Sequence, residues 1–416
     1  MRAMVRYELK KVFGSVGGKI ALIMYVAVLV LSCWLGSTGV LNADVKWVNG
    51  QGESEYSLSA VQKLRNARNE WAGWLDEEKL NQVVQENQRI NATPEAKSDV
   101  VQQRNIAYCW KQGFNPIRNL ISHAYSNGFR EYDYYTADRI SVIDENSFYA
   151  NRIKILKEWL YDETDNAYHK YSEQEKQYII HIYEELETPF YFDYYEGWHQ
   201  LLENSSYISG LGILILGFLL AGIFSNEFKW KADSVFFSSL HGRSKATSAK
   251  IKAGFLLVTV LYWAAMLVYS LFTLCYLGFE GANCVIQWEV WKTIYNLTMW
   301  QAWVLTLICG YIGNLFLAFL TMWISSKTKS TVLAVTVPFV LTLVPSILGE
   351  IADWLDKILT LSPNILLECY QSLRYFDVMT ILGKVYRTLD IGILLYLMLS
   401  VILIPMMYLE YQRTRA

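Results

Sequence analysis

Long apolar blocks without a single Asp, Glu, Lys or Arg interrupt a chain of 416 residues. A helix needs about 20 mostly apolar residues to cross the hydrocarbon core of a bilayer. Six blocks reach or approach this length, namely 20–36, 206–224, 253–279, 302–324, 331–349 and 391–409. The pattern therefore predicts an all-α membrane protein with six transmembrane helices.

The charges between these blocks predict the orientation of the chain. Alternate segments, 1–19, 225–252, 325–330 and the tail after residue 409, together hold 15 basic and 4 acidic residues. The segments 280–301 and 350–390 together hold 5 basic and 8 acidic residues. Because Lys and Arg accumulate in cytoplasmic loops, we expect a multi-pass protein of the plasma membrane with both termini in the cytoplasm. The amphipathic residues 1–19 are expected to form a cytoplasmic helix at the membrane surface.

The 169 residues 37–205 separate the first two blocks and are expected outside the cell. They include 17 basic and 27 acidic residues, so a basic surface for nucleic acid is absent. Helix-start signals recur along this segment: Ser57 or Ser59, Thr93-Pro94, Asn115-Pro116, and a capping box from Ser172 to Glu175. Strand-like alternation is scarce, so we expect a large helical extracellular domain inserted after the first span.

Aromatic residues are dense in this domain and allow two interpretations. Tyr134, Tyr135 and Trp159 could contact a cationic, amphipathic ligand on an acidic surface, or they could simply form a helical core. A second group lies just before the block at 206, where a belt of aromatic side chains would sit at the membrane interface. We expect the following residues to act as interfacial anchors of the second span: Tyr191, Tyr194, Tyr195 and Trp198.

Motifs for catalysis, nucleotides or metals are missing from the sequence. The nearest approach to a phosphate-binding loop, Gly14 to Ile20, is one residue too short and leads directly into an apolar block. His169 and His181 lie outside any metal-binding motif, so we expect no metal site. Free thiols are expected, although a Cys284–Cys369 disulfide would agree with the predicted topology. We therefore expect neither an enzyme nor a cofactor in this chain.

The spans also lack the ionisable residues on which ion-coupled transporters depend. Any transport against a gradient would then need energy from a partner protein. The basic segment 225–252 is the expected docking loop, because its apolar side chains are unusual for a loop of this charge: Trp230, Val235, Phe236, Phe237 and Leu240. A short amphipathic helix that presents Phe236, Phe237 and Leu240 on its surface would fit a groove on a partner, or an amphipathic helix in this segment would lie on the membrane surface. Composition alone leaves both alternatives open.

This segment resembles the first intracellular loop of ABC transporter permeases of the type-2 exporter class. Glu227, Ser238, Gly242-Arg243 and Lys250 fall at the matching places of that loop. The chain departs from the family at Lys231, where glycine is favoured, and at Leu240, where proline is favoured. The residues Arg6 to Phe13 are similar to the family's N-terminal interfacial helix, and 350–390 is similar to its extracellular, re-entrant connection before the last span.

The resemblance implies a bacterial permease subunit that pairs with a second, identical or homologous permease and with cytoplasmic ATP-binding-cassette ATPase subunits. ATP and magnesium would then bind on the ATPases. The coupling residues implied in this chain are Glu227, Trp230, Phe236, Phe237, Leu240 and Arg243. The acidic, aromatic domain suggests an amphipathic substrate such as an antimicrobial peptide. The alternative function is a membrane receptor or sensor, whose extracellular domain binds a ligand and signals through the same loop.

Overall fold

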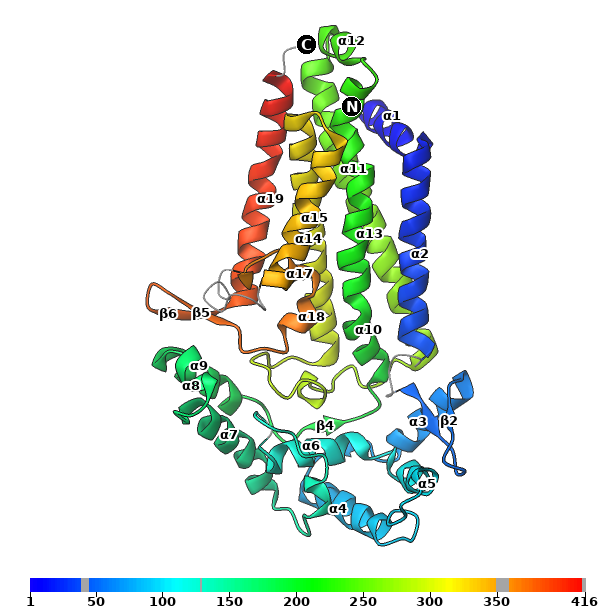
Figure 1. Ribbon diagram of the computed structural model, residues 1–416, viewed down its shortest axis with the longest axis vertical. Helices are drawn as coiled ribbons and strands as arrows, with labels where there is room; N and C mark the ends of the chain where they lie inside the picture. Colours follow the sequence, from blue (N-terminus) through cyan, green and yellow to red (C-terminus); the bar gives the residue numbers. More distant parts are fainter. Residues whose placement is uncertain (39–44, 128, 349–358, 414–416) are drawn as a thin grey trace.

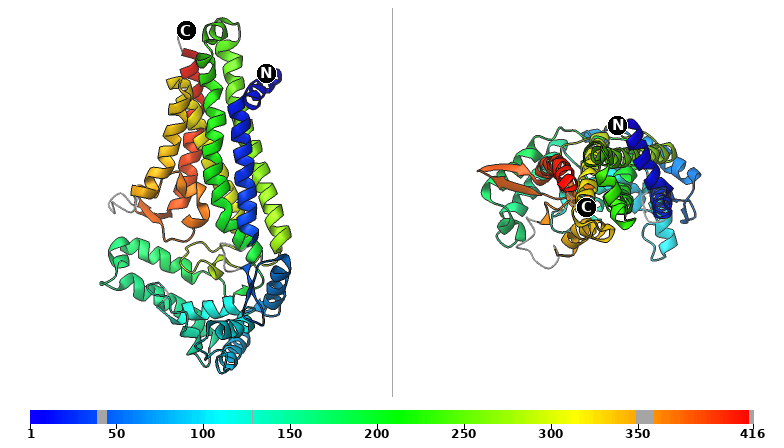
Figure 2. Two further views of the ribbon diagram at one scale, coloured as in Figure 1. Left: turned by 45° about the vertical axis from the view of Figure 1, so that its right-hand side comes forward. Right: turned by 90° about the horizontal axis from the view of Figure 1, so that it is seen from above.

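The computed structural model describes residues 1–38, 45–127, 129–348 and 359–413. The chain is mostly helical and divides into a long helix bundle and a helical domain at one end of the bundle (Figure 1). Both termini lie at the opposite end of the bundle, which we call the terminal end (Figures 1 and 2). The end that carries the helical domain is called the domain end.

Five helices of the described chain are long and apolar enough to cross a membrane. They are α2 (Val16–Thr38), the continuous helix from α10 (Glu196–Ser206) to α11 (Gly212–Lys229), α13 (Thr247–Leu277), α14 (Met299–Thr328) and α19 (Thr388–Arg413). These helices coincide with five of the six predicted blocks. A helical, membrane-compatible fold with several apolar spans is therefore confirmed.

The sixth predicted block, 331–349, coincides with α15 (Thr331–Leu348), a shorter apolar helix with prolines at 338 and 345. It packs against α11 and α14 in the bundle. Residues 349–358, which belong to the predicted end of this span and to the following connection, lie outside the described residues. A sixth crossing therefore remains a prediction.

The second apolar helix is longer than the sequence predicts. Residues 196–205 were expected in the helical domain, yet they form α10, which continues through a π-helical turn at Tyr207–Leu211 into α11. The combined helix of 34 residues has a length of about 50 Å, well above the roughly 30 Å hydrocarbon core. Its first turns therefore project into the domain end, where they contact the polar loops described below.

The helix α14 is the centre of the bundle. It packs against α11, α13, α15 and α19. Close packing depends on small residues: a side chain at Gly310 would meet the Tyr262 hydroxyl at 2.4 Å. The two short helices α17 (Asn364–Leu367) and α18 (Cys369–Ser372) also pack against α14, within the predicted re-entrant connection. A hairpin of β5 (Val378–Ile381) and β6 (Lys384–Arg387) follows and projects sideways from the bundle (Figure 1).

Among the described residues of the helical domain, seven α-helices precede α10. They are α3 (Leu58–Asn69), α4 (Glu77–Asn91), α5 (Val101–Lys111), α6 (Asn115–Tyr125), α7 (Glu145–Tyr161), α8 (Asn166–Lys170) and α9 (Glu173–Glu184). Two short antiparallel ladders accompany the helices. The first is local and pairs β1 (Trp47–Val48) with β2 (Ser54–Glu55), whereas the second joins distant segments and pairs β3 (Gly73–Trp74) with β4 (Tyr191–Phe192). The predicted helical character of this segment is confirmed.

The predicted helix starts are correct at three places and wrong at one. Ser57 caps α3, Asn115 begins α6, and Ser172 with Glu175 forms the capping box of α9. Thr93-Pro94 begins no helix; the Thr93 hydroxyl accepts a hydrogen bond from the amide of Ala96 within a turn, and α5 starts at Val101. A side-chain cap stabilises a turn as readily as a helix end, so this signal alone does not predict a helix.

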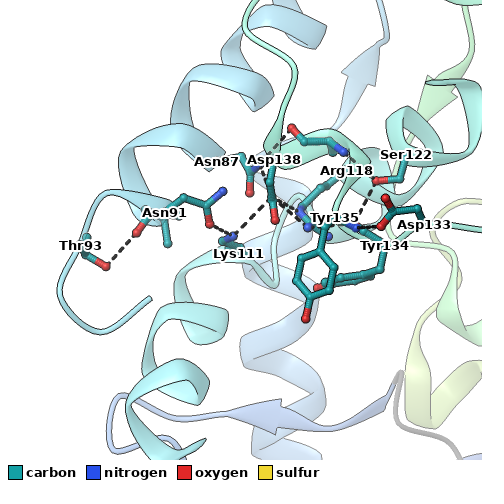
Figure 3. A network of polar contacts seen from close by, with 12 residues as sticks. Asn87, Asn91, Thr93, Lys111, Arg118, Ser122, Asp133, Tyr134, Tyr135 and Asp138 are labelled. Atoms are coloured by element: carbon teal, nitrogen blue, oxygen red, sulfur yellow. Dashed lines mark hydrogen bonds and ion pairs between the residues drawn. The ribbon is translucent and has the colours of Figure 1, made fainter. Parts of the chain in front are cut away.

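A buried polar network fixes the helices of the domain to one another (Figure 3). The Arg118 guanidinium, which is 1% exposed, donates to Asp138 Oδ1 at 2.9 Å and to the Tyr134 carbonyl at 3.1 Å. Asn87 from α4 donates to the same Asp138 oxygen at 2.8 Å. Lys111 Nζ lies 4.0 Å from it. A buried charge is tolerated only when it is paired, and here one carboxylate joins α4, α5 and α6.

Candidate functional site

A cluster of four charged side chains lies inside the terminal end of the bundle. Lys250 is fully buried on α13, and its ammonium lies 2.7 Å from Glu227 Oε1 and 3.2 Å from Glu8 Oε2. It also donates to the Ile223 carbonyl at 2.7 Å. Lys11 completes the cluster, with its Nζ 2.6 Å from Glu227 Oε1 and 3.6 Å from Glu8 Oε2. We call these four residues the terminal charge cluster.

Three separate elements supply this cluster. Glu8 and Lys11 lie one turn apart on α1 (Arg2–Gly14), which lies at an angle to the bundle axis (Figure 1). Glu227 occupies the last turn of α11, and Lys250 the first turn of α13. Burying an unpaired charge is so costly that removal of one partner strongly destabilises a protein. The two pairs of opposite charges therefore hold α1, α11 and α13 in one arrangement.

Lys11 is the partly accessible member of the cluster. Burial by itself lowers its pKa, but the hydrogen bond to Glu227 and the charges of Glu8 and Glu227 outweigh burial and raise the pKa above its ordinary value. The Lys11 ammonium also lies 5.6 Å from the centre of the Trp230 ring. Lys11 therefore stays protonated at neutral pH and connects the charge cluster to the exposed loop that follows α11.

An aromatic cluster closes the same end of the bundle. Tyr411, near the end of α19, is buried with its ring centre 4.7 Å from Phe224, 5.1 Å from Phe237 and 5.8 Å from Phe236. The two last residues belong to α12 (Asp233–Ser238), a short helix in the predicted coupling loop. Arg243 lies over the Phe237 ring at 4.9 Å and donates to the Gln412 carbonyl at 2.8 Å. The loop is thereby fastened to the C-terminal helix.

The structure separates the predicted coupling residues into an inner and an outer group. Glu227 and Phe237 are 5% exposed, Phe236 is half-buried, and Arg243 is bound to α19. Leu240 is 91% exposed and Trp230 is 51% exposed. The expected helix that presents Phe236, Phe237 and Leu240 on one surface is absent, because α12 ends at Ser238 and directs Phe237 into the protein. Val235, which is 72% exposed, joins Leu240 and Trp230 as an outward apolar residue.

A pocket of about 510 Å³ lies between α1 and the loop. Lys11, Glu8 and Glu227 line this pocket together with mostly apolar and small side chains, which include Met4, Tyr7, Val235 and Phe236. The pocket thus combines apolar side chains with three of the four residues of the terminal charge cluster. We call it the terminal pocket.

Two essential members of this region were not recognised as site residues in the sequence. Glu8 was visible only as the single acidic residue among five basic ones in 1–19, and Tyr411 follows the last predicted span without a motif. Both partners of Lys250 are distant in sequence, Glu8 by 242 positions and Glu227 by 23. An isolated acidic residue in a basic amphipathic helix is the one signal that could have indicated a buried ion pair.

The predicted ligand-contacting aromatic residues of the helical domain have different neighbours. Tyr134 stacks on Arg118 at 4.0 Å and meets Tyr135 edge-on, while Tyr135 is 62% exposed. Trp159 is half-buried and packs between Phe129 at 5.4 Å and Phe376 at 5.6 Å. Tyr134 and Trp159 therefore contribute to packing, and Tyr135 presents the most open ring of the three.

The predicted interfacial anchors are mainly protein-buried. Tyr194 is 0% and Tyr195 is 1% exposed, so neither ring faces lipid or water. Tyr191 and Trp198 are half-buried, and the Trp198 indole donates to the Phe279 carbonyl at 3.0 Å. The buried tyrosines directly precede α10 and lie against Gly278 and Gly281 at the start of the loop 278–298, an arrangement that the sequence pattern did not indicate.

A second pocket, of about 970 Å³, opens between α9 and the hairpin β5–β6. Its wall is acidic on the α9 side, with Glu173 and Glu175, and apolar on the other side, with Leu361 and Met379. Thr380 on the hairpin donates to Glu175 at 3.1 Å, so the domain and the bundle meet at this pocket. We call it the domain-end pocket.

The six cysteines are free, and Cys284 and Cys369 form no disulfide. Comparisons of the chain with protein-family models, with curated proteins and with solved structures found no match.

Proposed function

We propose that this chain is the permease subunit of an ATP-binding-cassette transporter, driven by a separate ATPase that docks at the terminal end. The main observation that supports this proposal is the contact of Glu227 with both Lys11 and Lys250. Glu227 and Lys250 are two of the positions that carry the resemblance to type-2 exporters. Because Lys11 belongs to α1, a displacement of the loop after Glu227 moves α1, α11 and α13 together.

The outer residues of the loop are the proposed contact surface for the ATPase. Val235 and Leu240 are exposed apolar residues on either side of the end of α12. Val235 also lines the terminal pocket, whose apolar side chains would contact the apolar face of an amphipathic partner helix. Closure of two ATPases would push on this surface. The contacts of Arg243 with Gln412 and of Phe237 with Tyr411 would then move α19 together with the loop.

The basic charge of the terminal-end segments supports a cytoplasmic location for this end, in the plasma membrane of a bacterium. ATP and magnesium would bind on the ATPase, and a second permease would complete the pathway. The proposed substrate is a cationic, amphipathic peptide. The domain-end pocket supports this class, because Glu173 and Glu175 supply negative charge opposite the apolar Leu361 and Met379.

Docking can be tested by purifying the full chain from its own membranes and measuring a co-purified ATPase. We expect an ABC-type ATPase with ATP hydrolysis in the wild type, and at least a tenfold loss of it with Leu240→Asp or Val235→Asp. The matched control is Leu382→Asp, a fully exposed leucine at the hairpin tip at the domain end, which should leave the complex intact. Absence of any nucleotide-binding protein from the wild-type preparation would contradict the proposal and favour the receptor alternative.

The substrate class has its own test in reconstituted vesicles. Binding of a fluorescent cationic amphipathic peptide should weaken at least tenfold with Met379→Lys, which places a positive charge in the domain-end pocket. Leu382→Lys, three residues further on the same hairpin, lies outside the pocket lining and should bind the peptide normally. Equal binding by all three proteins, or equal binding of an anionic peptide, would overturn the substrate assignment.

A further inference from the structure

A second charged cluster lies at the domain end, where the helix α10 begins. Glu196 and His199 occupy adjacent turns of α10, and Glu289 follows the 3₁₀ turn Ile286–Trp288 in the loop between α13 and α14. One ligand atom from each of the three residues lies within 4.8 Å of the others. Glu196 is 1% and His199 is 5% exposed, whereas the Glu289 side chain keeps 23% of its surface.

The contacts between these groups are too long for hydrogen bonds. His199 Nδ1 lies 3.6 Å from Glu196 Oε2, and the other ring nitrogen, Nε2, lies 3.8 Å from Glu289 Oε2. A single ion binds only one of the two nitrogens, and the three ligand atoms that could share an ion lie within 4.8 Å of one another. Hydrogen bonds between nitrogen and oxygen are about 2.7–3.2 Å long. Ligand atoms at about 2.0–2.2 Å from a tetrahedral ion are roughly 3.4 Å apart. Side-chain rotations that bring these atoms closer by up to about 1.4 Å would therefore place the three side chains around one ion.

Hydrogen bonds from neighbouring residues already orient the two carboxylates. Arg68 on α3 donates to Glu196 Oε1, which leaves Oε2 buried with no hydrogen bond from the described residues. The hydroxyl of Tyr195 is hydrogen-bonded to Glu289. Metal-binding carboxylates are commonly held in this way by a second layer of donors, which fixes their orientation. The buried Oε2, which points toward His199, is an independent sign of a missing ligand.

The backbone around the cluster is held in one position by glycines. A side chain at Gly197 would lie 2.2 Å from the Gly278 carbonyl, so α10 touches the loop backbone directly. Gly281 has a φ of +74°, and a side chain there would lie 2.5 Å from the Tyr195 Cα. These contacts keep the loop that carries Glu289 against the turn that carries Glu196 and His199.

We infer that Glu196, His199 and Glu289 bind a divalent transition-metal ion of the zinc class. One imidazole with two carboxylates suits zinc, whereas calcium prefers six to eight oxygen ligands. With a neutral imidazole, the two carboxylates and Arg68 carry a net charge of −1, which favours a dication. The ion would join the loop between α13 and α14 to the start of the long helix α10–α11. Its fourth position would be filled by water.

The experiment uses the full chain in lipid nanodiscs, purified without a polyhistidine tag and stripped with a chelator. Zinc binding is measured by competition with a chromophoric chelator and by elemental analysis. We expect about one zinc ion per chain, and at least a tenfold weaker affinity in His199→Asn and in Glu289→Gln. The matched control is His181→Asn, which removes an exposed histidine paired with Glu185 at 3.2 Å and should bind zinc as the wild type does.

A thermal scan separates lost binding from lost folding. Zinc should raise the Tm of the wild type and of His181→Asn but not that of Glu289→Gln, whose changed side chain is partly exposed. Two results would overturn the inference: zinc binding that His181→Asn weakens as much as His199→Asn does, or a stripped wild type that takes up no zinc.

Discussion

Lys11 and Glu227 form a hydrogen bond of 2.6 Å across 216 residues of sequence, and through it α1 is tied to the end of α11. The same carboxylate oxygen accepts a 2.7 Å hydrogen bond from the fully buried Lys250 on α13. Lys11 precedes the helical domain in the sequence, and Glu227 follows it. The contact therefore joins two parts of the chain that the helical domain separates.

Removal of Lys250 should strongly destabilise the bundle. Lys250→Met leaves Glu8 and Glu227 with Lys11 as their only cation in the cluster, and breaking a buried pair costs about 3–5 kcal/mol. The measurement is the free energy of unfolding in mild detergent. Lys252→Met, which changes an exposed lysine two residues away, is the control and should have little effect. The double variant Glu227→Gln with Lys250→Met should recover part of the loss, and an equal or larger loss would contradict the pairing.

Enlargement of Gly197 should loosen the junction between α10 and the loop 278–298. In Gly197→Ala the new methyl group would lie 2.2 Å from the Gly278 carbonyl, so the backbone must separate, at a cost of about 1–3 kcal/mol. The melting temperature and the protease sensitivity of the loop would report the change. Gly210→Ala is the control, because nothing lies within 4 Å of the added atom. Identical melting temperatures of both variants would show that the close contact is not formed.

Acidification should weaken the helical domain through His123. Its ring stacks between Tyr132 at 4.2 Å and Trp291 at 5.3 Å, and burial, aided by the charge of Lys292, lowers its pKa to about 4. Because the folded pKa is below the ordinary 6.5, the unfolded chain binds more protons between these values, so stability falls as pH falls from 6.5 toward 4. The expected loss at pH 5 is roughly 2 kcal/mol.

This loss is measured as the difference in unfolding free energy between pH 7 and pH 5. His123→Phe keeps a stacking ring without a titratable group and should show a smaller pH dependence than the wild type. His169→Gln, which changes an exposed histidine of the same domain, should leave the wild-type dependence unchanged. A wild-type curve that His123→Phe does not flatten would refute the assignment to His123.

At alkaline pH, the stability of the protein should depend on the protonation of Lys111. Burial, partly offset by the charge of Asp138, lowers its pKa from 10.5 to about 8. The unfolded chain then binds more protons between pH 8 and 10.5, so stability rises with pH in this range, by roughly 1 kcal/mol between pH 7 and pH 9. In Lys111→Met this gain should disappear. The free energy of unfolding of both proteins is measured at each pH, and the difference between them removes the contribution of other groups. The same pH dependence in both proteins would contradict the prediction.

Sequence signals predicted the structure correctly where the interactions concerned lie within a single helix. The uncharged blocks around α2, α10–α11, α13, α14 and α19 were recognisable because a span must be apolar along its whole length, whatever it packs against. The capping box of Ser172 and Glu175 was recognisable because its two hydrogen bonds join residues three positions apart. Thr93 failed as a signal because the same hydrogen bond also closes a turn.

The sites themselves depend on contacts that no local pattern contains. Phe237 was expected on the surface, but the ring of Tyr411, from the other end of the chain, covers it. Glu196 and His199 lie one turn apart and were not recognised as a pair of ligands, because their third member, Glu289, comes from a loop about 90 positions later. The sequence by itself determined the apolar helices and most of their ends, since bilayer length and backbone capping act within one segment. Only the tertiary structure decided which charges are buried together, because an ion pair depends on distance in space and not along the chain.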